Sequence, residues 1–139
     1  MKNYDVVIIG AGPAGIVTGV TVKKYFPEKK VLIITEEKKG LVPCGIPYIF
    51  NKLDNVDADS MGPKAFLDLG GDVVIDPVVS VSLNQKQLLG KSGNRYGYDK
   101  LVFATGSQPV EASFIKGHNL ENVFYIKKVI SISAIYMIG

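Results

Sequence analysis

Two short motifs carry residue types whose spacing could do chemistry. The first is a glycine-rich hexapeptide at positions 10–15, directly after the apolar run at 6–9. Glycines at this spacing allow a tight turn after a strand and close approach of the backbone to a pyrophosphate. The second motif, at 43–48, holds Cys44, the only cysteine of the chain, and a thiol can exchange electrons or attack a disulfide. The first motif reads Gly10, Ala11, Gly12, Pro13, Ala14 and Gly15.

A dinucleotide bound at the first motif also needs an acid for its ribose. The helix predicted over 13–25 would place its free N–H groups and dipole at the pyrophosphate. The acid is expected after the second strand, predicted over 30–34. We prefer Glu36 over Glu37, and Thr35 takes the position if the strand ends one residue earlier. The alternative is a glycine turn that binds nothing, followed by glutamates in a solvated turn.

Cys44 lies between Pro43 and Gly45, where a helix over 45–50 is predicted to begin. A helix N-terminus stabilises a thiolate, and together with the glycine motif upstream this favours a redox role for Cys44. The alternative is an inert, packed cysteine, which is the commonest fate of a free thiol.

Composition bounds the function classes. The 139 residues carry a net charge of +3, and the lysine pairs are spread along the chain between acids. We therefore expect a solvated surface and no nucleic-acid partner. Glycines interrupt the apolar N-terminal stretch, so we expect no signal peptide and no membrane span. One cysteine excludes an intrachain disulfide, and His118, the only histidine, makes a metal site unexpected. A reducing, cytoplasmic setting fits best.

The patterns predict an α/β fold of the Rossmann type with a parallel sheet. Buried strands are expected at 4–9 and 30–34 and a further apolar strand at 99–104, with helices at 13–25, 45–50 and 63–69. Alternating residues over 72–89 predict an inserted antiparallel meander, with a turn at Asn84-Gln85 and a second loop at 90–97. A loop is expected at 51–60 and a further strand at 123–126. We expect one domain over 1–126 and an apolar tail at 127–139 that begins a further segment.

Together with a third motif, these residues resemble a known family. The third motif, at 98–109, runs from a strand into the turn Ala104-Thr105-Gly106. Over residues 3–126 the chain resembles the N-terminal flavin domain of the pyridine nucleotide-disulfide oxidoreductases. It is most similar to the single-cysteine branch, which holds coenzyme A disulfide reductases, NADH oxidases and peroxidases, and sulfur or polysulfide reductases.

The resemblance implies FAD at the first motif and Cys44 as the redox thiol facing the flavin. It implies that hydride passes from NAD(P)H to FAD and then to Cys44 or to oxygen. The expected acceptors are a small disulfide, oxygen, peroxide or a sulfur compound, and the choice among them, like that between NADH and NADPH, stays open. The expected cofactor-binding set is Gly10, Ala11, Gly12, Pro13, Ala14, Gly15, Thr35, Glu36, Glu37, Pro43, Cys44, Val79, Ala104, Thr105 and Gly106.

The family's nicotinamide-binding and dimerisation domains have no counterpart in this sequence. We therefore expect this chain to be the FAD-binding portion of an NAD(P)H oxidoreductase, with the NAD(P)H site elsewhere and no complete turnover by this chain alone. A homo-oligomer is expected. The alternative is a non-catalytic dinucleotide-binding module whose cysteine is structural.

Overall fold

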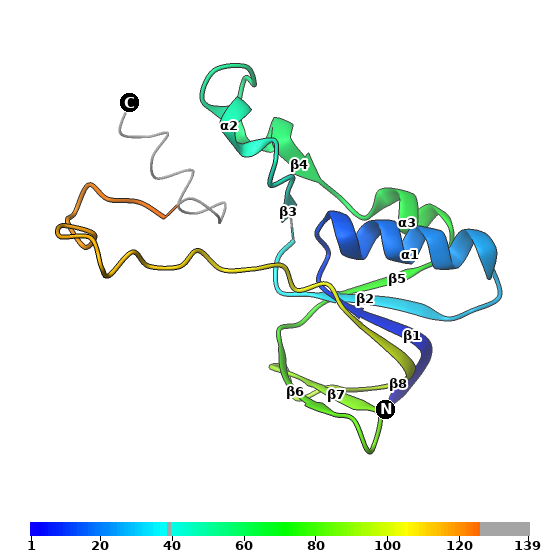
Figure 1. Ribbon diagram of the computed structural model, residues 1–139. Coiled ribbons are helices and arrows are strands. Elements are labelled where there is room, and N and C mark those ends of the chain that lie inside the picture. Colours follow the sequence, from blue (N-terminus) through cyan, green and yellow to red (C-terminus); the bar gives the residue numbers. More distant parts are fainter. Residues whose placement is uncertain (39, 126–139) are drawn as a thin grey trace. The chain divides into compact units, whose positions relative to one another are not determined.

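The computed structural model describes residues 1–38 and 40–125 (Figure 1). The chain divides into two compact units, which are described separately. The sheet unit comprises Met1–Gly40 and Met61–Gly106, and the cysteine unit comprises Leu41–Ser60 and the chain from Ser107 onward.

The sheet unit is built on six strands in the order β5-β2-β1-β8-β7-β6. Strand β1 pairs in parallel with both β2 and β8, and β2 pairs in parallel with β5. Strand β7 is antiparallel to β6 and to β8, so the meander joins the parallel strands through β8. The bounds are β1 Lys2–Ile9, β2 Val31–Thr35, β5 Asp72–Ile75, β6 Val78–Ser82, β7 Gln87–Gly90 and β8 Arg95–Phe103.

One face of the parallel strands packs against helices α1 (Pro13–Tyr25) and α3 (Lys64–Asp68) (Figure 1). Successive side chains of a strand point to opposite faces, so Ile8 and Ile33 share the helix face. They form a core with Ile16 of α1 and Phe66 of α3, and the Phe66 side chain is fully buried. Burying a side chain of this size stabilises the fold by about 1.5–3 kcal/mol.

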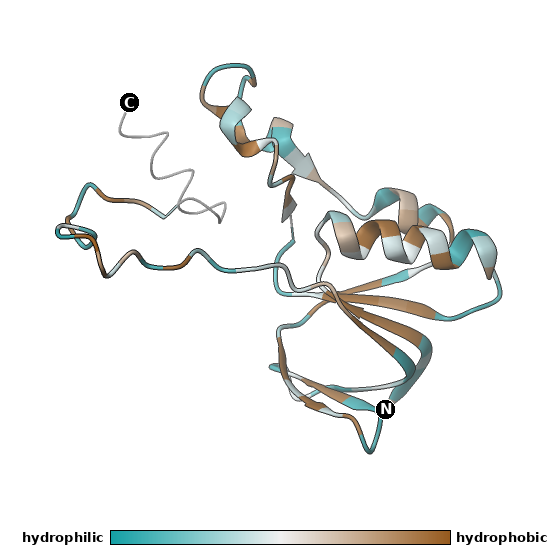
Figure 2. Cartoon of the chain, viewed as in Figure 1, coloured by the Kyte–Doolittle hydropathy of each residue, from teal (hydrophilic) through white to brown (hydrophobic). Residues whose placement is uncertain are grey.

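The other face of the same strands packs against the meander. Val7 and Leu32, next in sequence to the helix-facing residues, form a second core with Leu88 of β7 and Tyr96 of β8. Figure 2 shows the resulting apolar colour along most of β1 and β2. Strands buried on both faces read as continuous apolar runs, which is why the runs at 6–9 and 31–34 predict them.

Local contacts fix where α1 ends. The Lys23 side chain is buried, and its Nζ donates hydrogen bonds to the carbonyl oxygens of Pro27 at 2.6 Å and Lys29 at 3.0 Å. The amide of Phe26 donates to the carbonyl oxygen of Val22 at 2.8 Å. The carbonyl oxygens of Val22, Pro27 and Lys29 are therefore paired at the end of the helix and in the turn that follows.

A buried carboxylate holds the meander to the parallel strands. Asp76, between β5 and β6, accepts hydrogen bonds from the amide of Ser92 at 3.0 Å and from the hydroxyl of Tyr96 at 3.0 Å. The Ser92 hydroxyl also donates to it. These bonds hold the pKa of Asp76 below its usual value, with the Ser92 hydroxyl contributing most.

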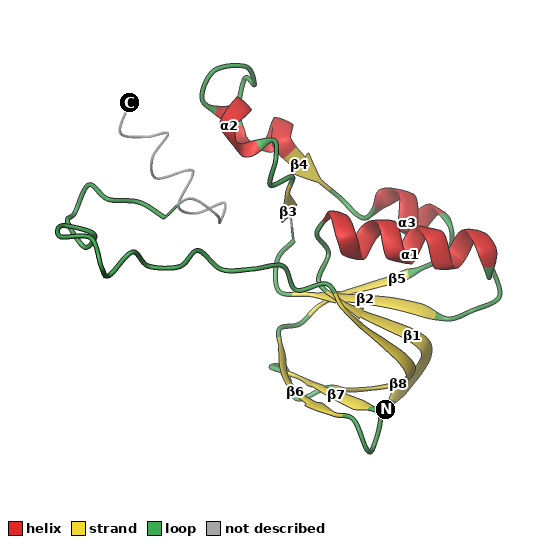
Figure 3. Ribbon diagram, viewed as in Figure 1, coloured by secondary structure: helices red, strands yellow, loops and turns green. Residues whose placement is uncertain are grey.

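The cysteine unit has little regular structure (Figure 3). It contains α2 (Ile46–Ile49) and the 3-10 helix η1 (Val56–Asp59). Strands β3 (Gly40–Leu41) and β4 (Ser60–Met61) pair as a two-stranded sheet. Residues 107–125 contain no helix or strand.

The Rossmann-type α/β class is confirmed, and the strand–helix–strand unit over residues 4–34 lies within one or two residues of its predicted bounds. Three boundaries are wrong. Residues 72–75 form β5 in the parallel sheet beside β2, not part of the meander. Strand β8 begins at Arg95, inside the loop predicted at 90–97, because its first residues pair with β7. The loop predicted at 51–60 contains η1 and the start of β4.

The strand predicted at 123–126 is also wrong for residues 123–125, which adopt no regular structure. Residue 126 and the apolar tail at 127–139 lie outside the described residues.

Candidate functional site

At the turn from β1 into α1, the glycine motif at 10–15 meets the motif at 98–109. Gly10 has a φ of +108°, a conformation that side chains with a β-carbon rarely adopt. A β-carbon there would overlap with the carbonyl oxygen of Ala104. The amide of Gly10 donates to the carbonyl oxygen of Ile34 at 2.8 Å, and the amide of Ala104 donates to that of Ile9 at 2.8 Å. The ends of β1, β2 and β8 therefore meet at this turn.

The remaining glycines of the motif divide into a packed one and an open one. A β-carbon on Gly15 would overlap with the carbonyl oxygen of Gly10, so the helix lies directly against the turn. A β-carbon on Gly12 would meet no described atom within 4 Å. Gly12 has an ordinary φ of −74°. Neither the backbone conformation nor the packing of the described residues therefore requires a glycine at this position. The space in front of it is what an approaching pyrophosphate requires.

The N-terminus of α1 has the electrostatics of an anion site. Gly12 is the N-cap, no side chain caps the helix, and the first turn carries no acidic residue. The first N–H groups of a helix have no partner within the helix, and its dipole favours negative charge there. Pro13 and Ala14 occupy the first turn, and Pro13 lacks an N–H at a position where none is needed. These residues fit a pyrophosphate.

The residues predicted for the ribose lie at the neighbouring strand end. Thr35 is the last residue of β2, so Glu36 is the first residue after the strand. The hydroxyl of Thr35 accepts from the amide of Glu37 at 3.4 Å, and its carbonyl oxygen accepts from the amide of Asp76 at 2.8 Å. Glu36 and Glu37 are exposed.

Four further predicted residues also belong to the sheet unit. Ala104 follows β8 directly and is half-buried, Thr105 is exposed, and Gly106 has a φ of +70°. Val79, in β6, lies where the pairing register with β7 shifts between Val78 and Ser80, and 58% of it is exposed. Ligands of open α/β sheets bind outside the carboxyl ends of the parallel strands, where the ends of β1, β2 and β8 lie.

Pro43 and Cys44 belong to the cysteine unit, where Cys44 is exposed. The amide of Gly45 donates to the carbonyl oxygen of Val42 at 2.8 Å, and α2 follows with Pro47 in its first turn. The predicted helix start is confirmed, although the helix has only four residues.

The sequence reasoning missed Asp59, which packs against this turn. A β-carbon on Gly45 would overlap with Oδ1 of Asp59. Asp59 is 6% exposed, and its Oδ2 is buried without a hydrogen-bond partner among the described residues. Asp59 lies in a polar stretch of the sequence, and nothing in that stretch indicates that its side chain is buried. Only the fold shows this.

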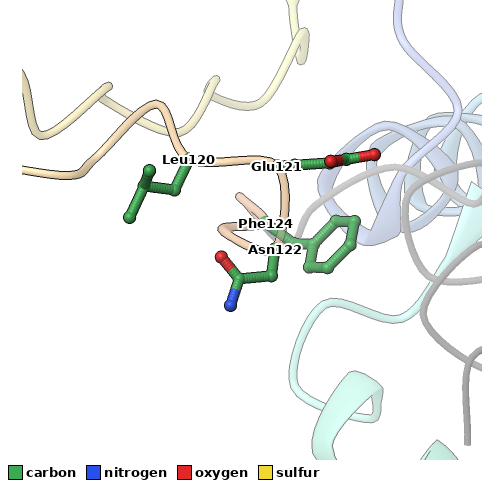
Figure 4. Close-up of a pocket in the computed structure, with 4 residues that line it drawn as sticks. All are labelled: Leu120, Glu121, Asn122 and Phe124. Atoms are coloured by element: carbon green, nitrogen blue, oxygen red, sulfur yellow. The ribbon is translucent and has the colours of Figure 1, made fainter.

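Other features of the described residues add no competing site. A pocket lined by Leu120, Glu121, Asn122 and Phe124 contains none of the predicted residues (Figure 4). Among residues 1–38 and 40–125, no group of three His, Cys, Asp or Glu side chains could hold a metal ion. His118 lies with its Nδ1 3.1 Å from Oε1 of Glu111. No helix in the described part of the chain is both long and apolar enough to span a bilayer.

The chain is similar in sequence to known oxidoreductases. The chain is 30% identical over 133 residues to an NADH oxidase of Methanocaldococcus jannaschii, which covers 88% of this chain and 29% of the relative. It is 35% identical over 124 residues to an NAD(P)H coenzyme A polysulfide/persulfide reductase of Pyrococcus horikoshii, covering 86% and 28%. The chain thus spans less than a third of the length of either relative.

A solved structure agrees at the level of the fold. The NAD-dependent persulfide reductase of A. fulgidus superposes with a TM-score of 0.82 at 23% identity, covering 97% of this chain and 27% of that one. The family described as pyridine nucleotide-disulphide oxidoreductase matches residues 4–136. The three motifs, the Rossmann-type sheet and this match agree, and the chain belongs to the pyridine nucleotide-disulphide oxidoreductase family.

Proposed function

We propose that this chain is the FAD-binding portion of a flavin-dependent NAD(P)H oxidoreductase. The family implies a flavin and a nicotinamide nucleotide. The observation that supports FAD binding by this chain is the open space in front of Gly12, at a turn where Gly10 and Gly15 are both closely packed. The open position lies at the helix start, where a pyrophosphate would approach the backbone.

The residues of the sheet unit hold and orient the cofactor in this proposal. N–H groups at Gly12, Ala14 and Gly15 face the pyrophosphate, and the dipole of α1 favours its charge. Glu36 accepts hydrogen bonds from the ribose hydroxyls, with Glu37 and Thr35 as the alternatives. The bound flavin would accept hydride and supply two-electron redox chemistry.

Further contacts complete the proposed cofactor site. Ala11 and Pro13 shape the first turn, and Val79, Ala104, Thr105 and Gly106 line the site from β6 and from the end of β8. The sequence also predicts Pro43 and Cys44 as cofactor contacts. NAD(P)H is proposed to bind outside this chain.

Cys44 is the proposed redox residue, and its exposure supports this role. Its thiolate would attack one sulfur of a small disulfide, forming a mixed disulfide and releasing the other sulfur as a thiolate. Two electrons, supplied through the flavin from NAD(P)H, would then reduce the mixed disulfide to two thiols. Disulfides and polysulfides fit this exchange as acceptors. Peroxide would instead oxidise the thiolate to a sulfenic acid with release of hydroxide, and the same two electrons with two protons would return the thiol and release water. Oxygen would take its electrons from the bound flavin rather than from Cys44. A reducing cytoplasmic setting would keep Cys44 available as a thiol.

Calorimetric titration with FAD, ADP and adenosine tests the cofactor proposal. FAD and ADP both carry a pyrophosphate and should bind the purified chain, with FAD displaced by ADP. Adenosine lacks the pyrophosphate and should bind at least about tenfold more weakly. Equal affinities for ADP and adenosine, or binding of neither FAD nor ADP, would contradict the proposal.

Single-turnover thiol release tests the role of Cys44. The FAD-loaded chain is reduced anaerobically with one equivalent of dithionite and then mixed with glutathione disulfide. The parent should release two thiols per flavin, and Cys44→Ser should bind FAD equally well but release none within the same time. Equal thiol release by both proteins would show that the cysteine is structural.

A further inference from the structure

Contacts among Val42, Gly45 and Asp59 link the residues on either side of Cys44 within the cysteine unit. The amide of Val42 donates to the carbonyl oxygen of Asp59 at 3.1 Å, and the amide of Gly45 donates to the carbonyl oxygen of Val42 at 2.8 Å. The Asp59 side chain then returns to Gly45, because its Oδ1 occupies the place of a β-carbon there. Asp59 thus contacts the turn on both sides of the cysteine, through its backbone and through its side chain.

Burial of the Asp59 carboxylate costs free energy of folding. Asp59 is 6% exposed, and Oδ2 has no hydrogen-bond partner among the described residues. A buried polar atom without a partner loses the hydrogen bonds that water would give it. A neutral apolar side chain could fill the space beside Gly45 without that loss. The presence of an acid therefore points to a role for its charge as well as its shape.

We propose that Asp59 is a positioning residue for the Cys44 thiol, which holds the turn through Gly45 and places the negative charge of its carboxylate against that neighbour of the cysteine. This inference rests on the proposed redox role of Cys44. The charge belongs to the residue that packs on Gly45, the immediate neighbour of the cysteine. Because it is buried, salt screens it less than it screens an exposed charge. It would slow the approach of anions to the thiol and so favour neutral acceptors over anionic ones.

Alkylation of Cys44 with two reagents that differ in charge separates the charge from the packing. Iodoacetamide is neutral and iodoacetate is anionic, and both modify the same sulfur. In Asp59→Asn, which keeps the shape, the ratio of the iodoacetate rate to the iodoacetamide rate should rise about threefold or more at 0.15 M salt. Asp54→Asn removes an exposed acid from the same stretch and should leave the ratio unchanged. An unchanged ratio in Asp59→Asn would overturn the proposal.

A second set of variants tests the packing. Gly45→Ala should change the iodoacetamide rate, because the new methyl group displaces the carboxylate. Gly45→Ala combined with Asp59→Ala should return that rate toward the parent value, since the methyl group then fills the vacated space. Equal rates in Gly45→Ala and the parent would overturn the contact.

These measurements need no flavin turnover. A raised reagent ratio in Asp59→Asn together with no thiol release by the FAD-loaded parent would contradict the proposed function of Cys44 alone. The reverse pattern would contradict the role of Asp59 alone.

Discussion

Gly10 and Ala104 meet at the ends of two parallel strands, so closely that a β-carbon on Gly10 would overlap with the carbonyl oxygen of Ala104. This contact joins the first motif to the third, although the two lie at opposite ends of the sheet unit's sequence. The register of β1 on β8, with Ile9 beside Phe103, brings the two turns together. The geometry of the turn at Gly12 therefore depends on a non-local strand pairing.

Gly10→Ala should destabilise the fold through both conformation and overlap. The left-handed conformation alone costs about 1–2 kcal/mol, and displacement of the Ala104 backbone adds to it. Gly93→Ala is the matched control, because Gly93 also has a positive φ, +86°, but faces open space. Urea unfolding should show a larger loss of unfolding free energy for Gly10→Ala than for Gly93→Ala. Equal losses would show that the contact with Ala104 is unimportant.

The acid at the end of β2 should contribute to cofactor affinity. If Glu36 accepts hydrogen bonds from the ribose, Glu36→Ala should weaken FAD binding by about 1.5–3 kcal/mol, roughly ten- to a hundredfold. Glu37→Ala, one residue further along, should change it little. Calorimetric titration distinguishes the two, and the opposite result would move the role to Glu37. Two silent variants would point to Thr35 or to the backbone.

Asp76 should make the stability of the sheet unit depend on pH in the acid range. Its hydrogen bonds, led by that from the Ser92 hydroxyl, lower its pKa in the folded state. A lowered carboxyl pKa stabilises the fold fully above the unfolded-state pKa of about 4, and this stabilisation is lost as pH falls through the folded-state value. Asp76→Asn should therefore show a shallower loss of unfolding free energy below pH 4 than the parent.

At neutral pH the same substitution should be destabilising. The amide of Asn would present a donor to the Tyr96 hydroxyl, which loses its acceptor at a cost of about 1–3 kcal/mol. Asp99→Asn, at an exposed position in β8, is the control. An Asp76→Asn variant as stable as the parent at pH 7, by urea unfolding, would contradict the assignment.

Self-association is expected from exposed apolar side chains in residues 107–125. Val110 is 85% exposed, Phe114 84% and Leu120 61%. Water solvates such surface poorly, so two chains gain by burying it. The parent should form dimers or larger species at high micromolar concentration in sedimentation experiments, and Phe114→Glu should shift it toward the monomer. Tyr25→Glu, at a position in α1 that is 77% exposed, should leave the association unchanged. A monomeric parent would contradict the expectation.

The sequence predicts local features well because their causes are local. The run at 6–9, the glycine turn and Pro13 fall within one strand–helix unit, and their pattern gives its bounds closely. The sequence places residues 72–75 in the meander because a short apolar run does not say which strand it pairs with. Asp59 was missed for the same reason, since its burial against Gly45 depends on the path of the chain between them.

FAD binding by Gly12→Val tests the central claim most directly. The valine side chain would meet no described atom within 4 Å at its β-carbon and requires no unusual φ, so the fold should persist with unchanged circular dichroism. Gly62→Val is the matched control, because Gly62 is another open glycine outside the motif. The proposed site predicts that Gly12→Val loses FAD affinity by at least about a hundredfold while Gly62→Val keeps the parent affinity. Equal FAD affinity in Gly12→Val and the parent would contradict it.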